Sequence, residues 1–166
     1  MTAKKIVKFC IAIALCLLVG FIGLYFFTAS TPVWYARLLK PDITLPSWIF
    51  INLWTVFYLL LGVSLYLIFQ SGSKRHDVKH GLILFGSQLL LNICWFFCFF
   101  GLQSTFLGLM MMLLLWVVIL VTIFLAYRFS LPAAMVLIPC LGWVSYVGYL
   151  NYAILVLNPG SFGLSF

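Results

Sequence analysis

The stretch WYARLLKPDITLPSWIFINLWTVFY, residues 34–58, joins a basic, proline-marked segment directly to an apolar run rich in aromatic residues. Its two prolines, Pro41 and Pro46, disfavour helix at the residue before each of them, so residues 38–45 are predicted to form a loop. A helix is expected to begin at Ser47, either capped by that serine or with Pro46 in its first turn.

Aromatic rings follow one another closely in this expected helix. Five of them lie within about three turns, namely Trp48, Phe50, Trp54, Phe57 and Tyr58. Trp54, Tyr58 and Gly62 recur every four residues and therefore share one face. Such a face suits a flat apolar ligand, and it also suits the boundary region of a membrane.

The composition of the whole chain indicates the class of protein. Of 166 residues, 66% are hydrophobic and only 7% are charged, and the mean hydropathy is +1.27. Such a chain cannot cover a water-soluble surface with polar groups, so we expect an integral membrane protein. The net charge of +7 would suggest nucleic-acid binding in a soluble chain. Here the charges lie between apolar runs, so they indicate topology, and no nucleic-acid partner is expected.

Five segments are long enough to cross a hydrocarbon core as helices, which takes about 20 residues. They cover residues 6–28, 47–70, 79–101, 105–128 and 132–157. Backbone polar groups in lipid must be paired within their own segment. The predicted fold is therefore an all-α membrane protein, a five-transmembrane-helix bundle that forms a single domain over residues 1–166. The first segment exceeds the length of a secretory signal core, so we expect it to be retained.

Lys and Arg are divided unequally between the two sides of this arrangement. One side carries Lys4, Lys5, Lys8, Lys74, Arg75, Lys79 and Arg128, and the other carries Arg37 and Lys40. The positive-inside rule then predicts a cytoplasmic N-terminus, and we expect the inner or plasma membrane of a bacterium. The loop of residues 34–46 would lie on the outer side, where it can cover the bundle.

The polar side chains within the segments are mainly amides. Asn52, Gln88, Asn92 and Asn151 lie among tryptophans, and no Asp, Glu, Lys or Arg falls near the middle of a segment. Proton-coupled transport and ion conduction are therefore not indicated. Singly, such amides most often form hydrogen bonds between helices. Among aromatic rings they also suit a pocket for a large hydrophobic ligand.

Conventional catalytic and metal sites are not indicated. His76 and His80 lie one helical turn apart beside Asp77, but metal sites usually have three or four ligands, so a solvated turn is the favoured interpretation. Two acidic residues and two histidines do not supply a Ser/His/acid arrangement. No catalytic residue, metal ligand or required cofactor is predicted.

A set of short elements resembles the TspO/MBR family, the tryptophan-rich sensory proteins and translocator proteins, formerly called peripheral benzodiazepine receptors. The resemblance covers about residues 20–158 and rests on Trp34, Tyr35, Lys40, Pro41, Pro46, Trp48, Phe50, Trp54, Thr55, Tyr58, Gly62, Leu91, Asn92, Trp95, Phe99, Phe100, Gly101, Pro139, Leu141, Trp143, Leu150, Asn151, Leu157 and Asn158. It implies a bacterial member of the family: a five-helix bundle, usually a homodimer, whose first loop closes a cavity between the helices. It also implies binding of tetrapyrroles such as protoporphyrin IX or haem, and of related flat hydrophobic molecules.

The resemblance further implies a set of ligand-binding residues. They are Trp34, Tyr35, Trp48, Trp54, Tyr58, Asn92, Trp95 and Trp143. Cys140 stands where the family often has tyrosine, which removes a ring and a hydroxyl near the pocket. The sterol pattern of animal members needs a basic residue after Tyr152, and none follows Arg128, so sterol binding is not carried over.

Three functions are compatible with these observations. The first is tetrapyrrole binding in sensing, regulation or transport, with Arg37 and Lys40 meeting the carboxylates of the ligand. The second is an enzyme that degrades bound porphyrin in light and oxygen, which needs no acid or base. The third is a structural partner protein without a ligand, in which the amides only join helices.

Overall fold

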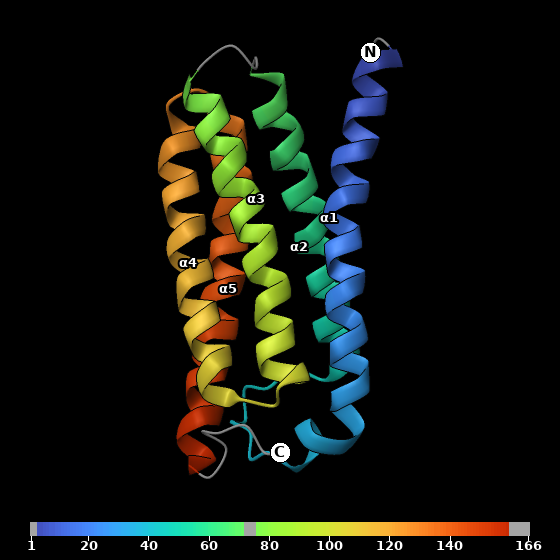
Figure 1. The fold of residues 1–166 in the computed structure, drawn as a ribbon, viewed down its shortest axis with the longest axis vertical. Helices are drawn as coiled ribbons and strands as arrows, with labels where there is room; N and C mark the ends of the chain where they lie inside the picture. Colours follow the sequence, from blue (N-terminus) through green and yellow to red (C-terminus); the bar gives the residue numbers. More distant parts are fainter. Residues whose placement is uncertain (1–2, 72–75, 160–166) are drawn as a thin grey trace.

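Five long helices stand side by side and alternate in direction (Figure 1). The computed structural model describes residues 3–71 and 76–159, with the backbone alone described for residues 76 and 77. The helices are α1 (Ala3–Ser30), α2 (Ser47–Gln70), α3 (His76–Phe96), α4 (Thr105–Tyr127) and α5 (Leu131–Leu157). All five are long and apolar enough to cross a membrane, so the predicted all-α membrane fold is confirmed.

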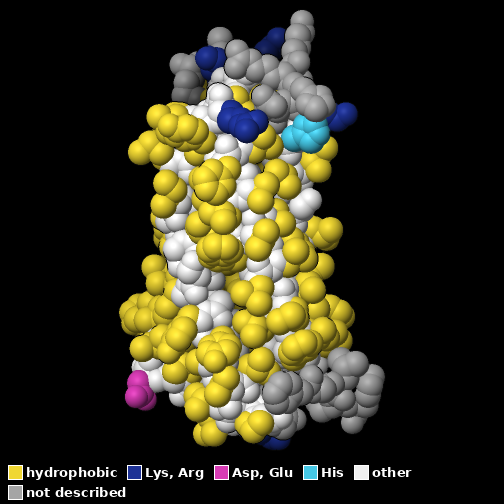
Figure 2. Space-filling model, turned by 90° about the vertical axis from the view of Figure 1, so that its left-hand side faces the viewer, with side chains coloured by type: hydrophobic (Ala, Val, Ile, Leu, Met, Phe, Trp, Pro, Cys, Tyr) yellow, Lys and Arg dark blue, Asp and Glu magenta, His cyan; other side chains and the backbone are white. Residues whose placement is uncertain are grey.

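The face of the bundle in Figure 2 is apolar along most of its length, and Lys and Arg gather on it mainly at the end where α1 begins. Large hydrophobic side chains are exposed on all five helices. Lys79 and Arg128 lie at this end, because α3 begins there and α4 ends there. Lys74 and Arg75, which the topology prediction also counts, lie outside the described residues. An apolar belt of this length needs lipid around it, so the chain is an integral, multi-pass membrane protein.

The first helix continues further than the sequence predicts. After Ser30 the chain passes through a π-helical turn, η1 (Thr31–Tyr35), and leaves the helix only near residue 38. Pro32 has no N–H to donate, and the wider turn accommodates the missing hydrogen bond without ending the helix. The placement of Trp34 and Tyr35 in the loop is therefore wrong, since both residues belong to η1. A similar turn, η2 (Phe97–Gly101), ends the third helix.

The loop of residues 38–46 is fastened to α5 by side-chain hydrogen bonds. The Asn158 side chain accepts a bond from the Leu39 N–H and donates one to the Leu39 carbonyl, each at 2.9 Å. The Tyr146 hydroxyl donates to the Ile43 carbonyl at 2.8 Å. This part of the chain is thus an ordered cover over one end of the bundle.

Lys40 is engaged within the same loop. Its ammonium group lies 4.7 Å from the centre of the Tyr35 ring and donates to the Leu38 carbonyl at 3.0 Å. Partial burial lowers the pKa of Lys40 from its ordinary value. Lys40 must leave these partners if it is to meet a ligand carboxylate, whereas Arg37 is exposed.

Replacing Asn158 by alanine is expected to release the loop while the bundle stays folded. Both hydrogen bonds to Leu39 are lost, and a net loss of about 1.4 kcal/mol corresponds to roughly a tenfold increase in local opening. Hydrogen exchange of the amides of residues 39–45, followed by mass spectrometry, measures this opening. Asn52→Ala, which removes an exposed amide from α2, is the matched control. Equal protection of the loop in both variants would contradict the role given to Asn158.

Candidate functional site: a cluster of aromatic rings

Three tryptophans from three helices meet inside the bundle. Trp54 of α2 stacks on Trp95 of α3, with ring centres 5.0 Å apart and an angle of 13° between the planes. Trp143 of α5 meets the Trp54 ring edge to face at 5.7 Å. All three are buried. Aromatic pairs at such distances are each worth about 0.5–1.5 kcal/mol beyond burial, so the three rings join α2, α3 and α5.

A buried hydrogen bond crosses the same region. The Tyr58 hydroxyl donates to Asn92 Oδ1 at 2.7 Å, which links α2 to α3. Both residues are buried. In this environment the bond has little competition from water. We refer to Trp54, Tyr58, Asn92, Trp95 and Trp143 as the aromatic site.

A second amide closes the site toward α5. The Trp95 indole N–H donates to Asn151 Oδ1 at 3.2 Å, and Asn151 Nδ2 donates to the Val147 carbonyl at 2.8 Å. The prediction that the amides form hydrogen bonds between helices is confirmed for Asn92 and Asn151. This bond also fixes the orientation of the Trp95 ring.

Two buried polar groups near this site have no hydrogen-bond partner among the described residues. They are the indole N–H of Trp143 and the side-chain amide of Gln88, which lies one turn from Asn92 on α3. A buried polar group without a partner costs about 1–3 kcal/mol. A ligand atom that accepts a hydrogen bond from Trp143 would therefore be favoured.

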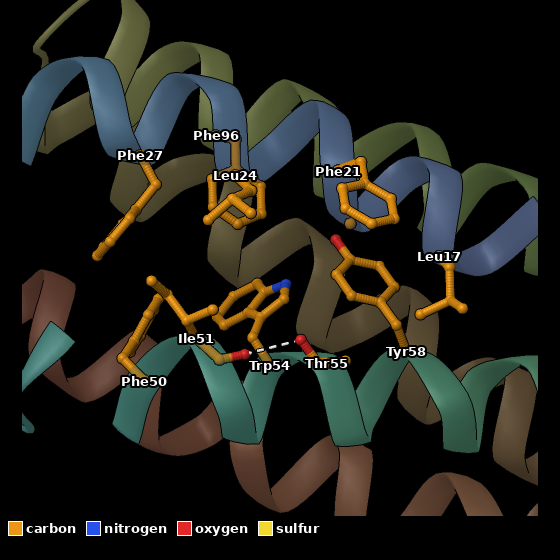
Figure 3. A pocket seen from close by; sticks show the side chains of 11 residues that line it. Leu17, Phe21, Leu24, Phe27, Phe50, Ile51, Trp54, Thr55, Tyr58 and Phe96 are labelled. Atoms are coloured by element: carbon orange, nitrogen blue, oxygen red, sulfur yellow. Dashed lines mark hydrogen bonds between the residues drawn. The ribbon is translucent and has the colours of Figure 1, made fainter. Parts of the chain in front are cut away.

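Two cavities lie on either side of Trp54 and Tyr58. The inner cavity has a volume of about 20 Å³, and Asn92, Cys140 and Trp143 are among the residues that line it. The outer cavity has a volume of about 70 Å³ and lies between α1 and α2, with Phe96 of α3 at its back (Figure 3). Pockets for drug-sized molecules have volumes of about 300–1,000 Å³. Both cavities are smaller than this, because aromatic side chains fill the space around them.

The sequence of this bundle matches one known family over most of its length. The model of the TspO/MBR family matches residues 12–157. The chain belongs to the TspO/MBR family. Its relatives include the tryptophan-rich protein TspO of Chlorobaculum tepidum, which is 40% identical over 156 residues, or 94% of this chain and 99% of that protein. The human translocator protein is 31% identical over 141 residues, or 84% of this chain and 83% of that protein.

The structure brings together most of the site residues predicted for this TspO/MBR protein. Trp54, Tyr58, Asn92, Trp95 and Trp143 form the aromatic site, as described above.

The other three predicted residues lie further out. Trp34 and Tyr35 approach from η1, with ring centres 5.5 and 6.2 Å from that of Phe99. Phe99 in turn stacks on Trp95 at 6.0 Å, so these two residues border the aromatic site without entering it. Trp48 is 67% exposed at the start of α2 and lies apart from the site.

Sequence reasoning assigned no site residue to α1, although this helix of the TspO/MBR protein forms one wall of the outer cavity. Gly20 and Gly23 allow the α1 backbone to approach two rings closely. A Cβ atom on Gly20 would lie 2.6 Å from the Tyr58 ring, and one on Gly23 would lie 2.3 Å from the Phe96 ring. Small residues are enriched where membrane helices pack closely, so the two glycines were a signal that was available in the sequence.

Metal-binding side chains do not cluster in the part of the chain that the structure describes. No group of three or more His, Cys, Asp or Glu residues lies close enough there to hold a metal ion. The side chains of His76 and Asp77 lie outside the described residues. The five cysteines are free thiols, and Cys140 lies beside Trp143 in the wall of the inner cavity.

Proposed function

We propose that this TspO/MBR protein binds a tetrapyrrole, of the protoporphyrin IX or haem type, or a related flat hydrophobic molecule at the aromatic site. Binding serves sensing, regulation or transport of that molecule. The observation that carries the proposal is the meeting of Trp54, Trp95 and Trp143 from three helices beside the Asn92 amide. Flat rings stack on a conjugated macrocycle, and the few polar groups orient it.

The unpartnered indole N–H of Trp143 supports this proposal. In a purely structural cluster a buried donor without an acceptor is only destabilising, whereas a bound ligand can supply the acceptor. Asn151 is already bonded to Trp95 and fits the structural function instead. Asn151 thus holds helices together, whereas the Trp143 indole N–H is left to meet a ligand.

The ligand must displace side chains, because the cavities on both sides of Trp54 are far smaller than a tetrapyrrole. Arg37 and Lys40 stand at the loop end of the bundle, where ligand carboxylates would meet them. The family resemblance implies that the proposed functional form is a homodimer. It would lie in the plasma or inner membrane of a bacterium with a cytoplasmic N-terminus.

Quenching of tryptophan fluorescence by protoporphyrin IX tests the proposal, with the protein in nanodiscs, first in the dark and then under illumination. Saturable quenching in the dark is the expected result. Conversion of the bound porphyrin to a new absorbing product in the light would favour the alternative function, photo-oxidative porphyrin degradation. Absence of saturable quenching would leave a structural partner protein as the better interpretation.

A further inference from the structure

The outer cavity lies on the side of the bundle that faces lipid. Figure 3 shows side chains of α1, among them Leu17 and Phe21, opposite Trp54 and Tyr58, which project from α2. Phe21 is 66% exposed, whereas Trp54 and Tyr58 at the inner wall are 7% and 2% exposed. A molecule dissolved in the bilayer therefore meets the rim of this cavity before it meets any part of the aromatic site.

Two side chains lie at the boundary between the outer cavity and the inner one. Trp54 and Tyr58 line both cavities, and beyond them lie Asn92 and Trp143. A rotation of these two rings would join the two spaces. The Tyr58 hydroxyl helps to hold this partition in place, since it donates a hydrogen bond to Asn92 at 2.7 Å.

The lining of the outer cavity suits a flat apolar molecule. Rings of six residues contribute to it: Phe21, Phe27, Phe50, Trp54, Tyr58 and Phe96. Its hydroxyl groups are paired within the protein, since Thr55 donates to the Ile51 carbonyl at 2.9 Å and Tyr58 donates to Asn92. An apolar molecule can therefore enter the outer cavity without leaving a polar group unpaired.

The loop end of the bundle is closed by hydrogen bonds instead of ring contacts alone. There the loop is held to α5 by the two Asn158 bonds to Leu39 and by the Tyr146 bond to Ile43. Opening that end breaks three hydrogen bonds, whereas moving the partition breaks the bond from Tyr58 to Asn92 and separates Trp54 from the rings that it contacts. The α1 wall is held by ring contacts at Gly20 and Gly23, which can separate without exposing polar groups to lipid.

We propose that the outer cavity is the entrance through which a flat apolar ligand passes from the bilayer to the aromatic site. Trp54 and Tyr58 form the gate, and its opening frees Asn92 to face the ligand. The proposal rests on the proposed function for its ligand, but the entrance itself is a property of α1 and α2.

Exchange kinetics of protoporphyrin IX in nanodiscs test the entrance. Ile51→Phe narrows the cavity from α2, and we expect the association and dissociation rates both to fall about tenfold while Kd stays unchanged. Phe21→Ala widens the rim, and we expect both rates to rise. Leu113→Phe, at a lipid-facing position of α4, is the matched control and should change neither rate. Unaltered rates in both cavity variants, or faster exchange in Asn158→Ala alone, would overturn the proposal in favour of the loop end.

A second measurement decides the question without porphyrin. In nanodiscs of phosphatidylcholine with brominated acyl chains, the contribution of Trp54 to quenching is the difference between the unaltered protein and Trp54→Phe. The entrance requires that bromine reaches Trp54 and that Ile51→Phe at least halves this contribution, whereas Leu113→Phe leaves it intact. If bromine does not quench Trp54, or if Ile51→Phe leaves the quenching of Trp54 unchanged, the proposal that the outer cavity is an entrance is wrong. If protoporphyrin IX fails to bind but this quenching behaves as expected, the proposed ligand is wrong and the entrance stands.

Discussion

Removal of two indole rings, in a Trp54→Ala, Trp143→Ala variant, is expected to weaken protoporphyrin IX binding about a hundredfold. Truncation of a buried tryptophan at a binding site commonly costs about 2 kcal/mol or more, and the effects of neighbouring residues are not additive. A combined loss of about 3 kcal/mol corresponds to a factor of about a hundred. Trp54 contacts both other tryptophans, and Trp143 carries the unpartnered indole N–H, so the variant removes stacking surface and a donor together. Titration followed by the porphyrin absorption band measures the affinity without relying on the remaining tryptophans.

Two further variants separate loss of binding from loss of folding. Trp116→Ala removes an indole whose N–H donates to the Ser145 hydroxyl, away from the aromatic site, and should keep the affinity. Trp54→Phe combined with Trp143→Phe retains rings at both positions and should lose less affinity than the alanine pair. An alanine pair that is helical and monodisperse yet binds normally would show that the ligand lies elsewhere.

Alanine in place of Gly23 is expected to destabilise the bundle by about 1–3 kcal/mol, the usual effect of overpacking. The new Cβ would lie 2.3 Å from the Phe96 ring. Phe96 cannot easily move, because its ring centre is 5.1 Å from that of Trp54 and 4.6 Å from that of Trp95. Either α1 separates from α3 or the aromatic site is displaced. The midpoint of thermal unfolding in detergent measures the effect.

The same substitution at Gly86 provides the control. A Cβ atom there would meet nothing within 4 Å, and the position is exposed on α3. In a helix, alanine is favoured over glycine by about 1 kcal/mol, so Gly86→Ala should leave stability unchanged or raise it slightly. Opposite signs at the two positions are the expected result, and a similar change at both would refute the role of close packing at Gly23.

Most of the fold could be predicted from the sequence because each helix is an uninterrupted apolar run. The predicted helix over residues 47–70 coincides with α2, and Pro46 explains its start. The error lies at Pro32, where proline rules would end a helix and the chain instead adopts a π-helical turn. The π-helical turn depends on tertiary packing, since it places the Tyr35 ring in contact with the rings of Phe99 and Phe100.

The aromatic site could be predicted only in part. Trp54 and Tyr58 share a face by their spacing, but the pairing of Tyr58 with Asn92 depends on the relative height of α2 and α3, which a single sequence does not contain. Trp48 lies six residues before Trp54 and so points about 120° away from it, which explains its exposure. Helical geometry alone could have separated these two tryptophans.

The way α1 is attached has a consequence for biogenesis. The hydrogen bonds described above join α2, α3, α4 and α5, whereas α1 packs through Gly20 and Gly23 against rings that are synthesised later. α1 contains no Asn or Gln. It can therefore stay in the lipid without a partner helix after it leaves the translocon, because it carries no side-chain amide that needs a hydrogen bond. The helices that carry Asn92 and Asn151 are inserted when their partners on earlier helices are already in the membrane. The order of the helices along the chain thus lets the amides of Asn92 and Asn151 find a hydrogen-bond partner as soon as their helices are inserted.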